Sequence, residues 1–166
     1  MGSMATLVVC GIAVLLALCM PRPALSFSKG PPLSACKEMV PRHSAGPTFT
    51  HHNFQLVVDR GIRERRVTVQ LLTTSSNVTF RGFLIRSMAV RGSSFIYFRG
   101  IFEKDTQFQD SLYLDCDGQD RSAISHGDNK TKKEVVVHWR PEPDPKNLVQ
   151  VFFRATVVQN FNRYFI

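Results

Sequence analysis

The chain has 166 residues, and its 21 lysines and arginines outnumber its 13 aspartates and glutamates, which gives a net charge of +8. Its one long uncharged apolar run, residues 7 to 20, is shorter than the roughly 20 residues that cross a bilayer as a helix. These features argue against a membrane-spanning protein and favour acidic partners, although a basic surface with no specific partner explains the charge equally well.

The amino terminus has the features of a secretory signal peptide. The apolar run is followed by Pro21, and small residues then stand at Ala24 and Ser26. A signal peptidase reads small residues at such positions, so we predict a signal peptide over residues 1–26, with cleavage after Ser26. The remaining residues 27–166 have the length of one domain and lose only Arg22 among the charged residues, which leaves 20 basic against 13 acidic side chains, or +7.

A secreted chain of this kind passes through an oxidising compartment. Cleavage would remove Cys10 and Cys19 and leave Cys36 and Cys116, so one disulfide is expected. The tripeptides that begin at Asn77 and Asn129 are both acceptors for N-linked glycans.

Residues 27 to 50 are rich in proline, glycine and serine, and we interpret them as an extended arm held by the disulfide. From residue 53 onward, apolar and polar residues alternate with a period of two, which is typical of strands buried on one face. The predicted strands cover residues 53–58, 66–71, 80–88, 95–102, 111–116, 135–139 and 148–159. No segment has a sustained helical period, and strands at such regular spacing indicate a β-sandwich or a barrel. Trp139 is expected to be buried near the disulfide, a pairing common in immunoglobulin-like sandwiches.

Two clusters of basic residues are candidates for ligand binding. Arg60, Arg63, Arg65 and Arg66 surround a glycine where a strand begins, and Lys130, Lys132 and Lys133 precede the strand that carries Trp139. Arginine suits phosphate and sulfate because its guanidinium fork matches their oxygens, but clustered charge is also typical of a solvated surface. Tyr97 and Tyr164 could stack on sugar rings or belong to the core.

No catalytic motif and no cofactor motif is present. His51 and His52 are adjacent, so on a strand they would point to opposite faces and bind no common metal. The acidic residues around Gly118 lack the glycine and final glutamate of a calcium loop. We predict no metal, no nucleic-acid partner and structural roles for His126 and His138.

The sequence resembles the reeler domain family, the module found at the start of reelin and of spondin-like matrix proteins. The resemblance covers roughly residues 30 to 166 and is carried by five short segments in order. They are Gly30–Pro32 through Cys36 with Met39, Pro41 and His43; Phe80–Leu84; Cys116 with Ile124–His126; Lys133, Val135, Val137, Trp139 and Pro141; and Phe153–Val158. The family usually has a tryptophan near its end, where this chain has Tyr164, Phe165 and Ile166, and its loops are less basic.

This resemblance implies an all-β, immunoglobulin-like antiparallel β-sandwich with a disulfide between Cys36 and Cys116. Secreted proteins that consist of one reeler domain are similar to the defence proteins of insect haemolymph, which are linked to antimicrobial responses. The resemblance therefore implies a secreted innate-immunity protein that binds lipopolysaccharide, teichoic acid or glucan without catalysis. The alternative is a matrix or adhesion module that binds glycosaminoglycans. Some ferric reductases carry a reeler domain, but their chemistry resides in a haem-bearing membrane domain, so no enzyme activity is expected here.

Overall fold

The computed structural model describes residues 27, 29–41, 46–48, 53–60, 66–142 and 150–166. The strands in these residues are β1 (Phe54–Arg60), β2 (Val67–Thr73), β3 (Gly82–Arg91), β4 (Ser94–Tyr97), β5 (Gly100–Lys104), β6 (Ser111–Leu114), β7 (Ala123–His126), β8 (Glu134–Pro141), β9 (Val151–Asn160) and β10 (Arg163–Phe165). One helical turn, α2 (Ala35–Glu38), precedes β1, and a 3-10 turn, η1 (Cys116–Gly118), lies between β6 and β7.

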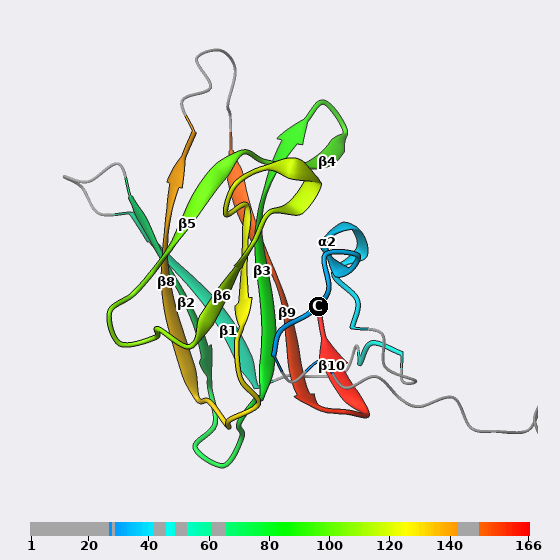
Figure 1. Cartoon of the computed structure of the whole chain (residues 1–166), viewed down its shortest axis with the longest axis vertical. Helices are drawn as coiled ribbons and strands as arrows, with labels where there is room; N and C mark the ends of the chain where they lie inside the picture. The colour runs from blue at the N-terminus through cyan, green and yellow to red at the C-terminus, as the bar shows by residue number, and fades with distance from the viewer. Residues whose placement is uncertain (1–26, 28, 42–45, 49–52, 61–65, 143–149) are drawn as a thin grey trace, which may run out of the picture.

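The strands form two antiparallel sheets packed face to face (Figure 1). One sheet has the order β1-β2-β8-β5, and the other has the order β10-β9-β3-β7-β6, with β4 also paired to β3. The chain crosses between the sheets several times, for example from β4 to β5. The predicted β-sandwich of the immunoglobulin type is confirmed.

The inward-facing side chains of both sheets form one apolar core. The four-stranded sheet contributes mainly valine and leucine from β2 and β8, and the six-stranded sheet contributes phenylalanine and isoleucine from β3 and β7. Trp139 on β8 is 2% exposed and packs against Phe153 and Phe98, with ring centroids 5.3 and 6.0 Å away. Burial of such alternating apolar residues is the main force that holds the two sheets together.

The structure differs from the sequence prediction in five respects. The predicted strand 95–102 is two strands, β4 and β5, which belong to different sheets. Strands β7 and β10 and the short helix α2 were not predicted. The buried position of Trp139 is confirmed, but the prediction that it lies near the disulfide is wrong, because Trp139 and the cysteines belong to separate apolar clusters.

Candidate functional site

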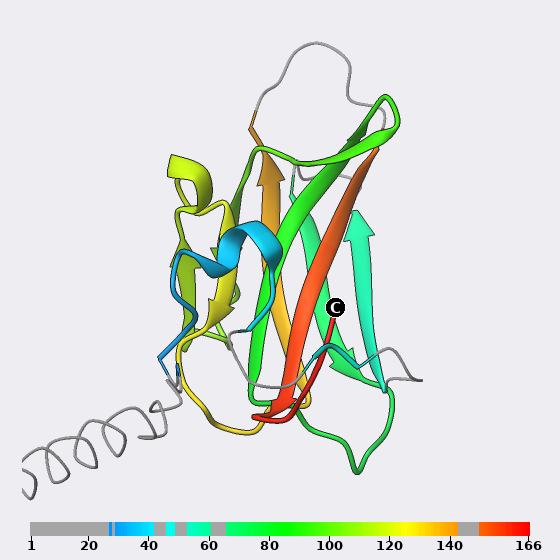
Figure 2. The same ribbon diagram turned by 90° about the vertical axis from the view of Figure 1, so that its right-hand side faces the viewer.

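Residues 29–41, together with Phe27, form an arm over the outer face of the six-stranded sheet. Figure 2 shows α2 lying across β3 and β7. A disulfide joins Cys36 in α2 to Cys116 in η1, as predicted, with Cα atoms 5.7 Å apart. Met39 follows α2, is fully buried, and packs with Leu84 of β3 and Ala123 of β7 in a second apolar cluster. The arm therefore gives β3 a buried outer face as well as a buried inner one.

A buried arginine fixes the arm to this outer face. Arg86 of β3 is 2% exposed and donates from Nη1 to the carbonyl oxygen of Cys36 at 2.6 Å and from Nη2 to Asp117 at 2.8 Å. The ring of Tyr97 covers its guanidinium at 3.5 Å, and the Tyr97 hydroxyl donates to the carbonyl oxygen of Lys37. Buried charges persist when they are paired and hydrogen-bonded in this way. Tyr97 therefore supports the arm.

Tyr164 belongs to the interior as well. Its side chain is 1% exposed, and this burial raises the pKa of its hydroxyl. Of the two tyrosines considered for stacking on sugars, Tyr164 is therefore buried, and Tyr97 has one ring face covered by the Arg86 guanidinium.

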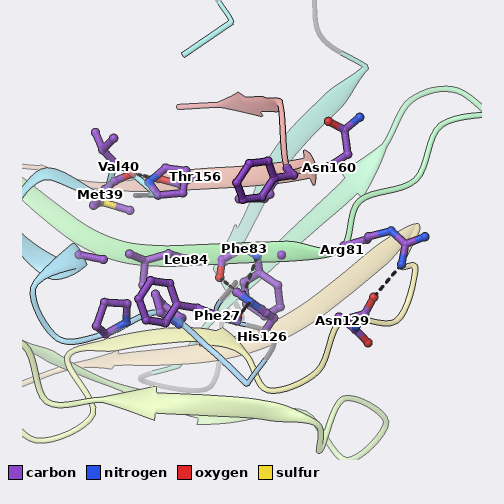
Figure 3. Close-up of a pocket in the computed structure, with 17 residues that line it drawn as sticks. Phe27, Met39, Val40, Arg81, Phe83, Leu84, His126, Asn129, Thr156 and Asn160 are labelled. Carbon is purple, nitrogen blue, oxygen red and sulfur yellow. Dashed lines mark hydrogen bonds between the residues drawn. The ribbon is translucent and has the colours of Figure 1, made fainter. Parts of the chain in front are cut away.

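A pocket of about 250 Å³ lies between the arm and the outer sheet face (Figure 3). Its floor is formed by β3 and β9, with Leu84, Thr156 and Val158, and the arm supplies Met39 and Val40. In Figure 3, Met39 and Val40 lie near one end of the labelled residues, and Arg81 and Asn129 lie at the other. The pocket is therefore elongated along β3, with an apolar end below the arm and a polar end at the start of the strand.

The polar groups inside the pocket already have partners within the protein. The hydroxyl of Thr156 donates to the carbonyl oxygen of Met39. Nδ1 of His126 lies 3.2 Å from the amide nitrogen of Phe83, and Nε2 lies 3.2 Å from the carbonyl oxygen of Phe27. Nδ1 also lies 3.1 Å from the carbonyl oxygen of Phe83 and 3.2 Å from the hydroxyl of Ser125. The structural role predicted for His126 agrees with this arrangement.

Arg81 stands at the polar end of the pocket. It is exposed, and Nη1 donates to the carbonyl oxygen of Asn129 at 3.3 Å. In the part of the chain that the structure describes, no acidic side chain lies within ion-pair distance of Arg81. Phe161, 38% exposed, lines the same opening. The opening thus combines an uncompensated cation with apolar surface.

Two of the three lysines predicted to bind ligand are held by acidic neighbours. Lys132 forms a short ion pair with Asp128, and Lys130 lies 3.5 Å from both Asp110 and Asp128. Burial alone would raise the pKa of Asp128, but the charge and hydrogen bonds of Lys132 and Lys130 hold it below its usual value. Lys133 is exposed and has no ion pair among the described residues, so it is the lysine of this cluster whose charge is most available.

The arginine cluster lies mostly outside the described residues, which contain neither Arg63 nor Arg65. Arg60 ends β1, and Arg66 is exposed just before β2. Along β8, Trp139 pairs with Val67 and Glu134 pairs with Leu72, so Val67, next to Arg66, and Glu134, next to Lys133, are five residue positions or about 17 Å apart at ~3.4 Å per residue. Arg66 and Lys133 therefore lie at opposite ends of the sheet.

The predicted glycan acceptors are both accessible. Asn77 is exposed in the β2–β3 loop, and Asn129 is exposed in the β7–β8 loop, at the lower end of the sandwich in Figure 1. A glycan on Asn129 would stand beside the opening of the pocket.

The predicted signal peptide and its cleavage point lie outside the described residues, as do His51 and His52.

A second hollow of about 640 Å³ lies where β1 and β9 leave the side of the sandwich open. Inward-facing residues such as Leu56 and Phe153 line it, and Phe95 at its rim is 68% exposed.

Among the described residues, no helix is long and apolar enough to cross a membrane. The described residues also contain no group of three or more His, Cys, Asp or Glu side chains able to hold a metal, and Asp115, Asp117 and Asp120 instead bond to arginines.

Comparison with known proteins gives a consistent result. Residues 34–166 match the model of the reeler domain family. A Bombyx mori protein named "Putative defense protein" is 28% identical over 93% of this chain and 88% of its own length. The protein named "Putative defense protein Hdd11" of Hyphantria cunea is 30% identical over 82% of this chain and 81% of its own length.

Two further matches concern larger proteins. A Xenopus laevis protein named "Putative ferric-chelate reductase 1" is 28% identical over 89% of this chain, but the match spans only 24% of that protein. The crystal structure of the human F-spondin reeler domain superposes with a TM-score of 0.55 at 17% identity, covering 78% of this chain and 88% of that one. The likeness to F-spondin concerns the fold alone. With the family match over most of its length, the chain belongs to the reeler domain family.

Proposed function

We propose that the protein is a secreted, non-catalytic defence protein that binds anionic polymers of microbial surfaces. The observation that carries this proposal is its match, over four fifths or more of both chains, to two insect proteins named as defence proteins. The disulfide and the family are consistent with an extracellular protein. In this proposal the signal peptide is removed after Ser26, and Asn77 and Asn129 carry glycans.

The proposed contacts are electrostatic. The basic residues Arg60, Arg63, Arg65, Arg66 and Lys133 would meet the phosphates of lipopolysaccharide or teichoic acid, with Lys130 and Lys132 contributing less because Asp110 and Asp128 offset their charge. A single exposed ion pair contributes only about 0–1 kcal/mol. A repeating polymer nevertheless binds well, because each later contact forms at a high effective concentration. Glucan carries no phosphate and would bind more weakly by this route.

The test is a binding assay with immobilised lipopolysaccharide, teichoic acid and glucan. Binding should weaken as salt rises from about 0.1 to 1 M, since the Debye length falls from about 10 to 3 Å. Replacing Arg63, Arg65 and Arg66 by glutamate should weaken binding, whereas replacing the same three by lysine should retain most of it. Binding that ignores both salt and the glutamate variant would refute the electrostatic proposal.

The second candidate is a matrix or adhesion module that binds glycosaminoglycans. It rests on the family to which the chain belongs, because the reeler domain also occurs in matrix proteins. Heparin and chondroitin sulfate belong in the same assay, at the same salt concentrations. Selective retention on these sulfated sugars, with no binding to lipopolysaccharide or teichoic acid, would favour this candidate over the defence role.

A further inference from the structure

The pocket beneath the arm has the features of a small-molecule site that is separate from the basic clusters of the proposed function. It is lined by side chains from β3, β7, β9 and the arm, and these walls are mainly apolar. Ligand sites in proteins are typically apolar hollows with a few polar groups that fix orientation. The chemistry of the walls and of the opening decides which class of ligand this pocket would accept.

The walls favour an apolar group. Thr156 and His126, which line the interior, already bond to backbone groups of Met39, Phe27 and Phe83. A polar ligand group placed there would lose its bonds to water and find no free partner, which is unfavourable. The side chains of Leu84, Val40 and Val158 offer only apolar contact. The interior is thus suited to an aliphatic chain.

The opening favours an anion. Arg81 has one described hydrogen bond, to the backbone of Asn129, and no described acidic partner, so several of its N–H groups are free to donate. A guanidinium binds carboxylate and phosphate through paired hydrogen bonds. Figure 3 places Arg81 and Asn129 at the end of the labelled residues away from Met39. A ligand lying along β3 would therefore carry its charge at one end.

We propose that this pocket binds a single-chain anionic amphiphile, with its aliphatic chain between Val40 and Val158 and its carboxylate or phosphate at Arg81. The volume sets the length of the chain. With roughly 30 Å³ for each water-sized group, 250 Å³ holds about eight methylene groups. The ligand class is thus a medium-chain fatty acid or alkyl phosphate.

A chain-length series tests the apolar part of the site. Calorimetry with the disulfide-bonded protein would compare butyrate, hexanoate, octanoate, decanoate and tetradecanoate below their micelle concentrations. Affinity should rise about fourfold for each added methylene and level off once eight to ten carbons fill the pocket. Affinity that does not depend on chain length, or that still rises at tetradecanoate, would overturn the proposal.

Two pairs of variants test the named residues. Val158→Phe should fill the pocket and weaken decanoate binding at least tenfold, whereas Val158→Ala should retain it. Arg81→Ala should weaken decanoate and decyl phosphate about tenfold and leave decanol unchanged. Arg99→Ala, an exposed arginine at the opposite end of the sandwich, is the matched control and should have no effect. Equal binding by all four variants would refute the assignment.

A mapping experiment keeps the proposal testable if Val158→Phe does not fold. Decanoate with a nitroxide on its chain should broaden the NMR signals of Leu84 and Val158 in the unaltered protein. Broadening centred on Leu56 and Phe153 would place the chain in the open hollow between β1 and β9, and would overturn the assignment to the pocket under the arm.

Discussion

Replacing Gly100 with any larger residue should destabilise the fold, because the indole of Trp139 lies directly against it. It is the first residue of β5 and sits diagonally opposite Trp139 on the inner face of the sheet. A Cβ atom built at this position falls less than 3.0 Å from three indole atoms, Cζ2, Cε2 and Nε1. The indole is held from its other sides by Phe98 and Phe153, so Gly100→Ala forces a movement of roughly 1 Å in a closely packed interior.

The expected cost follows from this geometry. Overpacking of a core costs about 1–3 kcal/mol, and the lower chain entropy of unfolded alanine returns about 0.4–1 kcal/mol. We therefore expect Gly100→Ala to lower the free energy of unfolding by about 1–2 kcal/mol and the Tm by roughly 3–8 °C. Urea unfolding and calorimetry measure both quantities. Gly46→Ala is the control, because no atom lies within 4 Å of its added Cβ. Equal Tm values for the two variants would show that the contact with Trp139 is not limiting.

Four other outcomes are expected. Joint replacement of Cys36 and Cys116 by serine should cost roughly 4 kcal/mol in urea unfolding, since the two cysteines are 80 residues apart; a cost below about 1 kcal/mol would contradict this. Asp117→Ala should cost about 1–3 kcal/mol, because the buried guanidinium that it pairs loses a partner, and a neutral result would mean that water replaces it. The backbone amide of Gln107, and then His138, hold the pKa of Asp105 below 3.8, so this carboxylate stabilises the fold above that pH and the stabilisation is lost as pH falls through its folded pKa. Asp105→Asn should therefore flatten the acid side of a plot of Tm against pH, and an unchanged plot would contradict the assignment. Asn129→Gln should remove the mass of one glycan from the secreted protein, which intact-mass measurement detects directly.

The strands that were predicted well are those buried on one face. In β1, β2 and β8 the outer residues are exposed or half-buried and the inner residues apolar, so the sequence alternates. Strand β7 was missed because Ala123, Ile124 and Ser125 are all buried. The arm covers one face of β7 and the core covers the other. Because neither face meets solvent, the sequence of this strand does not alternate between apolar and polar residues.

The break between β4 and β5 had no periodic signal either. The change of sheet at Phe98 and Arg99 depends on which strands the two halves pair with, which is a long-range property. The helix α2 has only four residues, too few to display a helical period.

The pocket could not be predicted from local pattern, because its walls come from four separate segments. One signal could have pointed to the arm's attachment. Arg86 interrupts an otherwise apolar strand, and a lone charge in such a strand is expected to be buried only with a partner. That partner, Asp117, lies beside one of the two cysteines. The arginine and lysine clusters, by contrast, are visible in the sequence. The distance between Arg66 and Lys133 follows only from the register of β2 and β8.

The disulfide between Cys36 and Cys116 links formation of the pocket to the redox state of the chain. One wall belongs to the arm and the floor to the sheet, and the arm is fastened to the sheet by this bond and by hydrogen bonds from Arg86 and Thr156. In a reducing compartment the chain would lack this disulfide, and only hydrogen bonds and apolar contacts would hold the arm on the sheet. If the chain is exported and the pocket binds a ligand as proposed, ligand capture would be acquired on oxidation during export and would weaken wherever extracellular thiols open the bond.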